Sequence, residues 1–266
     1  MLSLKQKRDE IALLEYKKSI FYKQFSLVKS KKKISRIGAI SYINIGLIKQ
    51  KIILKEEETT KFSFIENYSE EFKEFILNQK EEDKFWFCLG LDSFYGELTD
   101  FGGNKKKKDY NLSSTLSREL AEETKNIFDL NDLKVFQNKK STIENIIDKS
   151  PCIVYQENYC IVFIDFTELG YKLGFPYSIN HIFKNKETSK LEELENSSLH
   201  WIPSSELIKI INKRTPKIAK KKDFHCSKIE IDDKFKNEME MEFYPFLYEK
   251  LRVIIYPFLG IIFNYL

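Results

Sequence analysis

The feature that most constrains the fold is a set of short apolar runs, each too short for a buried helix. Residues 85–91 form one such run, and residues 152–155 and 159–166 form two more, separated by a polar turn at 156–158. Residues 199–202 are a fourth. Runs of this length, rich in aromatic and β-branched residues, are typical of buried strands. The composition of residues 37–54 further predicts a strand pair or long hairpin.

Helical patterns alternate with these runs along the chain. Residues 4–28 place apolar side chains at near-helical spacing, which predicts a basic amphipathic helix before the core. We expect further helices over residues 68–82, from Ser113 or Ser114, and from Ser204, since serine often caps a helix start. A final helix is predicted over residues 234–255. The fold class indicated is α+β with hairpins between sequence neighbours.

The 266 residues exceed the usual size of one domain but allow one large domain with extensions. We expect a basic helical extension over residues 1–36, a catalytic domain over 37–212, and a basic linker with a C-terminal helix over 213–266. Four isolated cysteines and a charged first segment indicate a cytoplasmic protein. The uncharged run 253–266 is short and contains Pro257 and Gly260, so we expect packing on the domain rather than membrane insertion.

Positive charge is concentrated in three places. Residues 1–36 carry eleven Lys or Arg against three acids, and the other basic stretches are Lys105 to Lys108 and Lys213 to Lys222. Such stretches can attract RNA or polyphosphate, although a charged run is more often plain solvated surface.

The segment with most chemical content is the predicted helix that carries Glu119, Glu122 and Glu123. Their i, i+3 and i+4 spacing puts the three carboxylates on one face, beside an apolar face of leucines. Like charges so placed destabilise a helix unless a cation compensates them, and hard oxygen ligands suit Mg²⁺ or Mn²⁺. Gly102 and Gly103, upstream, would let the backbone approach a metal or phosphate closely.

Alone, a glutamate-rich helix is also a common solvated surface. Other sites find no support, because His181, His200 and His225 are isolated and the phosphate-loop and nucleophile motifs are absent. The aromatic residues of the strands fit a core better than a base-stacking surface.

The glycines and the helix together resemble the signature of the Nudix hydrolases, G-x5-E-x7-R-E-U-x-E-E-x-G-U with U aliphatic. Gly103 matches the first glycine, and Arg118, Glu119, Leu120, Glu122 and Glu123 match the core of the motif. The loop is one residue longer than the pattern, so its first glutamate falls on Asp109 or Tyr110, of which Asp109 fits better. The later glycine is replaced, because Lys125 and Asn126 follow Thr124.

The resemblance implies a Nudix α/β/α sandwich with a mixed sheet. It also implies Glu119, Glu122 and Glu123 as ligands of Mg²⁺ or Mn²⁺, with one able to act as base, the carbonyl of Gly103 as a further ligand, and Arg118 as the residue that orients the glutamates. For a downstream carboxylate we expect Glu195, ahead of Trp201. Its rivals are Glu157, Asp165, Glu192 and Glu193.

The activity implied is hydrolysis of a pyrophosphate bond in a nucleoside diphosphate linked to another moiety. Small nucleotides such as ADP-ribose, dinucleoside polyphosphates or NDP-sugars are one substrate class. Removal of the 5′ cap of RNA is the alternative, and diphosphoinositol phosphates would also suit a basic pocket. A Nudix-like binding module without catalysis is the third possibility.

Overall fold

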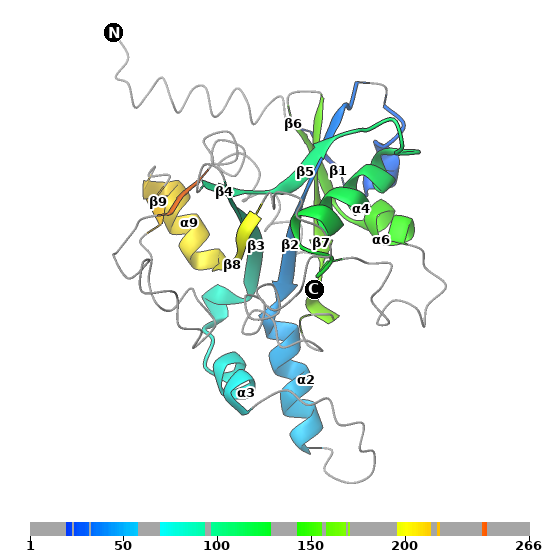
Figure 1. Cartoon of the computed structure of the whole chain (residues 1–266). Coiled ribbons are helices and arrows are strands. Elements are labelled where there is room, and N and C mark those ends of the chain that lie inside the picture. Colours follow the sequence, from blue (N-terminus) through cyan, green and yellow to red (C-terminus); the bar gives the residue numbers. More distant parts are fainter. Residues whose placement is uncertain are drawn as a thin grey trace.

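The computed structural model describes residues 20–22, 24–31, 33–57, 70–93, 97–128, 143–155, 158–168, 170, 196–213, 217–218 and 241–243. Strands and helices alternate through these residues, which confirms an α+β protein. Figure 1 shows helices around a twisted sheet. The strands are β1 (Ile20–Tyr22), β2 (Arg36–Asn44), β3 (Phe85–Asp92), β4 (Glu97–Thr99), β5 (Phe101–Asn104), β6 (Cys152–Tyr155), β7 (Tyr159–Asp165), β8 (Asn196–Pro203), β9 (Lys217–Ile218) and β10 (Met241–Phe243).

All described strands belong to one sheet of mixed direction. Its order is β1-β6-β7-β2-β3-β4-β10-β9, while β5 pairs with β2 and β8 with β3. The β2/β7 and β10/β4 pairs are parallel, and the other described pairs are antiparallel. The four strands predicted from the apolar runs are therefore confirmed as β3, β6, β7 and β8.

Strand β2 lies at the centre and determines where the two glycines lie. Its first half pairs with β5, so that Ile37 lies opposite Gly103 and Gly38 opposite Gly102, while its second half pairs with β3. A β-carbon on Gly102 would be 2.3 Å from the carbonyl oxygen of Ile37, so the two backbones need a glycine there.

The described helices surround this sheet. They are α2 (Ile45–Glu57), α3 (Glu70–Leu77), α4 (Leu112–Glu123), α6 (Ile143–Lys149) and α9 (Ser204–Lys213), with short 3-10 helices η1 (Phe25–Leu27) and η2 (Glu81–Asp83). Helix α4 packs against β5 and β2 and beside α6, whereas α2 and α3 lie together at one end of the sheet (Figure 1). The acidic helix predicted over residues 68–82 is confirmed as α3, and the helix start at Ser204 as α9.

An aromatic cluster joins the exit of α4 to the sheet. Phe128 stacks on Phe166 with ring centroids 4.5 Å apart and meets the edges of Phe101 and Trp201 at 6.2 and 6.4 Å. All four side chains are buried. Stacked and edge-to-face pairs add to the burial of apolar surface, so this cluster holds α4 against the sheet.

The prediction of a strand pair over residues 37–54 is wrong in its second half, which forms α2. Ile45, Ile48 and Ile52 are buried at helical spacing, and the Asn44 side chain accepts a hydrogen bond from the Leu47 N–H at 3.1 Å, which caps the helix. The isoleucine content of the segment favours a strand, but the helical spacing of the buried isoleucines and the Asn44 cap favour a helix, and the segment forms a helix.

The predicted terminal helices are wrong where the structure describes them. Ile20–Tyr22 form β1, which pairs with β6, and Phe25–Leu27 form a 3-10 helix, whereas residues 4–19 of the predicted helix lie outside the described residues. Met241–Phe243 form β10 rather than part of a helix, and most of residues 234–255 and the run 253–266 lie outside the described part as well. No helix in the described part of the chain is long and apolar enough to cross a membrane.

Candidate functional site

Helix α4 begins with a reciprocal cap that fixes the preceding loop. The Asn111 side chain accepts from the Ser114 N–H at 2.8 Å, and the Ser114 hydroxyl accepts from the Asn111 N–H at 3.0 Å. This capping box starts the helix at Leu112, one or two residues before the predicted serines. The loop from β5 therefore enters α4 in a defined direction.

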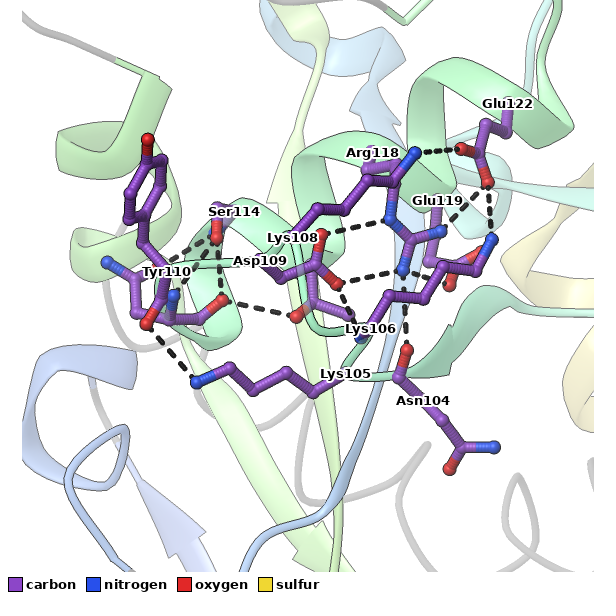
Figure 2. Close-up of polar contacts among 12 residues, drawn as sticks. Asn104, Lys105, Lys106, Lys108, Asp109, Tyr110, Ser114, Arg118, Glu119 and Glu122 are labelled. Atoms are coloured by element: carbon purple, nitrogen blue, oxygen red, sulfur yellow. Dashed lines mark hydrogen bonds and ion pairs between the residues drawn. The ribbon is translucent and has the colours of Figure 1, made fainter.

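Arg118 is the centre of the polar network at this site, as Figure 2 shows. Its Nε and Nη2 donate to the two carboxylate oxygens of Asp109 at 3.1 and 3.0 Å. Nη2 also lies 2.8 Å from Glu119 Oε1, and Nη1 donates to Glu122 Oε2 at 2.8 Å. The guanidinium thus connects the loop to two of the three predicted glutamates, which a planar fork with several donors can do.

Asp109 occupies the loop position at which the sequence left a choice. Its side chain is buried against Arg118, while Tyr110 is 92% exposed. Hydrogen bonds from Arg118 lower the pKa of Asp109 to about 2, and the N–H of Lys106 also donates to this carboxylate at 2.8 Å. The structure therefore selects Asp109 as the partner of Arg118.

Glu119 is buried against the second glycine of β5. A β-carbon on Gly103 would lie 2.4 Å from Glu119 Oε1, a distance that no ordinary contact allows. The carboxylate therefore lies beside the Gly103 backbone because this residue has no side chain.

Glu123 is equally buried, one turn further along α4. Its Oε1 accepts from the Gly102 N–H at 2.9 Å, and its Oε2 accepts from the side-chain amide of Asn196 at 3.3 Å. The paired glycines of β5 thus meet two buried carboxylates of α4, Gly103 at Glu119 and Gly102 at Glu123.

Glu122 differs from the other two glutamates because its side chain is 36% exposed. Besides Arg118, it pairs with Lys106 at 3.3 Å and Lys108 at 3.7 Å, both from the loop before the helix (Figure 2). Burial opposes ionisation of Glu122, but hydrogen bonding and charge from Arg118 and Lys106 outweigh it and lower the pKa. The three carboxylates thus divide into a buried pair and a partly exposed member.

The exit of α4 has the conformation that usually requires glycine. Lys125, at the position where the resemblance expects a glycine, has φ 49°, and Asn126 has φ 58°. The Asn126 N–H donates to the carbonyl of Ala121 at 2.8 Å, which is the long hydrogen bond of a Schellman motif with Lys125 in the left-handed position. Residue 125 therefore has the left-handed backbone conformation expected for the glycine of the motif, although it is a lysine.

The predicted downstream carboxylate is Glu195, and it lies outside the described residues together with Glu157, Glu192 and Glu193. The remaining rival, Asp165, lies opposite Tyr42 at the far end of β7, while the glycines pair with the other end of β2. Asp165 is therefore not brought to the site.

Two polar contacts at the site were not predicted. Asn196, the first residue of β8, hydrogen-bonds Glu123, and no motif in the sequence marks it. The buried hydroxyl of Tyr159 donates to the buried carboxylate of Asp100, above Gly38. Burial, and next to it the charge of Asp100, raises the pKa of Tyr159 well above its usual value. This pair becomes apparent only once β7 lies beside β2.

The oxygen chemistry suits a hard divalent cation, but the described side chains do not form a ready ligand cluster. No group of three or more His, Cys, Asp or Glu side chains within the described ranges is gathered closely enough to hold an ion. Glu119 and Glu123 are directed to the β5 glycines, whereas Glu122 pairs with lysines. Three-carboxylate binding therefore requires Glu122 to exchange its lysine partners for the ion.

The sequence, compared with known protein families and with curated proteins, matches none of them. The site geometry and the signature residues are thus the basis for any functional assignment.

Proposed function

We propose that this chain is a Nudix-type pyrophosphohydrolase that attacks, with water, one phosphorus of a nucleoside diphosphate linked to another moiety. The observation that carries the proposal is the Arg118 network. One arginine, held by both oxygens of Asp109, contacts Glu119 and Glu122 on either side. In a solvated glutamate-rich surface, by contrast, an arginine would be exposed and would have few fixed partners, whereas the Arg118 side chain is only 10% exposed.

The β5 glycines give the second support. Gly102 and Gly103 place backbone against Glu123 and Glu119, and larger residues would clash there. In the proposed enzyme, Glu119, Glu122, Glu123 and the carbonyl of Gly103 hold Mg²⁺ or Mn²⁺. The cation, when bound, supplies charge neutralisation on the phosphates and a more acidic water.

The chain's own groups have defined tasks in this proposal. Arg118 orients Glu119 and Glu122 and keeps Glu122 ionised, and Asp109 keeps Arg118 in place. One of the three glutamates Glu119, Glu122 and Glu123 accepts the proton of the attacking water. The fold proposed is the Nudix α/β/α sandwich, and the mixed sheet with α4 packed on β2 and β5 supports it.

The substrate class we propose first is a small nucleotide. The four lysines Lys105 to Lys108 are exposed beside the carboxylates and supply positive charge for a polyphosphate chain. RNA with a 5′ cap is the alternative, because the same loop could also contact a nucleic-acid backbone. The two predict different salt dependence, since an RNA tract releases more counterions than a single nucleotide.

The test is product release from a panel with Mg²⁺, with Mn²⁺ and with chelator. The panel contains ADP-ribose, a dinucleoside tetraphosphate, NDP-sugars, diphosphoinositol phosphates and capped RNA. Cation-dependent release of a monophosphate product from one class supports the hydrolase and identifies that class. No release from any member by the folded protein would favour the binding module instead.

A further inference from the structure

Asn196 contacts Glu123 through its side-chain amide but has no task in the reaction proposed above. It begins β8 opposite Asp92, at a point where the register between β3 and β8 shifts. The next residue, Ser197, is exposed and donates to the carbonyl of Leu91 at 3.1 Å. A register shift of this kind re-aims a side chain, and here the amide of Asn196 is directed inward and is only 2% exposed.

The place for this amide is made by Gly90 of β3. A β-carbon there would lie 2.5 Å from both Cγ and Oδ1 of Asn196, so the amide lies directly over the glycine. Any other residue at position 90 would push the amide away from Glu123. Gly90 therefore belongs to the site as much as the glycines of β5.

The orientation of the amide follows from its partners. Its nitrogen lies 3.2 Å from the main-chain oxygen of Glu123 and 3.3 Å from Oε2 of the same residue, which are both acceptors. The reversed amide would place Oδ1 against these two oxygens, so only the nitrogen fits on this side.

The oxygen of the same amide is buried and has no hydrogen-bond partner among the residues that the structure describes. An unsatisfied buried acceptor costs about 1–3 kcal/mol, so such a group usually has a partner in the working protein. The same small amide group contacts the buried carboxylate of Glu123 through its nitrogen, so its oxygen lies beside a negatively charged part of the site. A site built from acceptors with net negative charge favours a cation.

We propose that Asn196 Oδ1 is an oxygen ligand, directly or through one water, of the same divalent cation that Glu123 holds. The proposal rests on the proposed function, because it assumes the cation. It assigns to a neutral amide the downstream role for which the sequence suggested Glu195. The amide thereby has two tasks: its nitrogen positions Glu123, and its oxygen binds the cation.

The test is direct titration of Mn²⁺ into the full chain without nucleotide, by calorimetry. We expect Asn196→Ala to weaken Mn²⁺ binding about tenfold or more, within the range seen when metal-site partners are removed. Asn196→Asp keeps an oxygen at this position and should bind Mn²⁺ within a few-fold of wild type or tighter. Ser197→Ala, beside it, is the matched control and should leave the affinity unchanged.

The two tasks of the amide predict opposite results for Asn196→Asp. If Asn196 only positions Glu123 through its nitrogen, aspartate loses the donor, adds a repelling carboxylate and binds Mn²⁺ more weakly than alanine does. That ranking overturns the proposal, as does an unchanged affinity in Asn196→Ala.

Failure of the proposed function looks different from failure of this proposal. Wild type that binds no Mn²⁺ removes both, whereas wild type that loses Mn²⁺ in Glu123→Gln but not in Asn196→Ala removes only the role of Asn196. If Asn196→Ala does not fold, an NMR titration of the wild-type protein tests the role of Asn196 instead. Substoichiometric Mn²⁺ should then broaden the side-chain amide signal of Asn196 and spare that of exposed Asn78, and an unaffected Asn196 signal contradicts the proposal.

Discussion

Arg118 and Asp109 form a two-pronged pair, with Nε 3.1 Å from Oδ1 and Nη2 3.0 Å from Oδ2, both side chains being largely buried. The pair joins the loop after β5 to the middle of α4. Because Arg118 also contacts Glu119 and Glu122, the position of the loop and the geometry of the carboxylates are linked.

Removing the charge of Asp109 should therefore destabilise the protein in a pH-dependent manner. The pKa of Asp109 falls from its usual 3.8 to about 2. Because one pKa unit corresponds to about 1.4 kcal/mol, the ionised form of Asp109 contributes about 2 kcal/mol to the free energy of unfolding. Since the folded value is the lower one, this stability is present above about pH 4 and is lost as the pH falls to about 2. Asp109→Asn should thus lower the free energy of unfolding by about 2 kcal/mol at pH 7.

Urea unfolding of wild type and Asp109→Asn between pH 2 and 7 measures this difference. The difference in the free energy of unfolding between wild type and Asp109→Asn should become smaller below about pH 4. Glu81→Gln, at an exposed position, is the control and should show no such pH-dependent difference from wild type. A difference that stays constant down to pH 2 would contradict the role given to the charge of Asp109.

Gly103→Ala should displace Glu119, because the added methyl group would lie 2.4 Å from Oε1. We expect a loss of at least tenfold in Mn²⁺ affinity, in line with other disturbances of metal sites. Gly46→Ala in α2 is the matched control: its nearest atoms are side-chain atoms at 3.2 Å, and alanine favours the helix. Equal Mn²⁺ affinity in both variants would show that the position of Glu119 in the metal site does not require a glycine at residue 103.

Lys125→Gly should stabilise the protein by about 1 kcal/mol, because Lys125 holds a left-handed conformation that glycine adopts without strain. Lys125→Ala removes the same side chain but keeps the strain, so it should not stabilise. Thermal unfolding of the two variants separates the backbone effect from any side-chain contact. A higher melting temperature for alanine than for glycine would refute the explanation by strain.

Asn111→Ala should cost about 1 kcal/mol of stability, since it removes the acceptor of the capping box at the start of α4. Asn78→Ala, at an exposed position after α3, serves as the control and should lie within about 0.5 kcal/mol of wild type. Chemical unfolding measures both, and equal stabilities would mean that the cap contributes nothing.

The sequence predicted the fold well where one signal dominated. The apolar runs of β3, β6, β7 and β8 have no competing helical period, and all four are strands. Residues 45–54 carried two signals, isoleucine content and helical spacing, and only the Asn44 cap resolved them in favour of a helix. The pairing of β10 with β4 joins residues far apart in the chain, for which local patterns give no information.

The residues of the candidate site likewise fall into those that local sequence patterns predicted and those that they did not. Spacing on one helix predicted that Glu119 and Glu123 share a face, and the loop count offered Asp109 or Tyr110 for the first glutamate of the motif; the structure adds that Asp109 pairs with Arg118. The contribution of Asn196 depends on β8 lying against β3 over Gly90, a contact between distant segments. Tyr159 meets Asp100 only through the parallel pairing of β7 with β2. No local sequence pattern identifies residues that are brought together only by such pairing.

Metal-dependent hydrolysis by the carboxylates of α4 is tested by comparing the turnover of the substrate panel by wild type and Glu122→Gln, with Glu81→Gln as a control for loss of a glutamate elsewhere. We expect Mg²⁺- or Mn²⁺-dependent release of a monophosphate product by wild type and Glu81→Gln, and a loss of at least about a hundredfold in the rate of release by Glu122→Gln. Release by a folded Glu122→Gln at the wild-type rate would contradict this expectation.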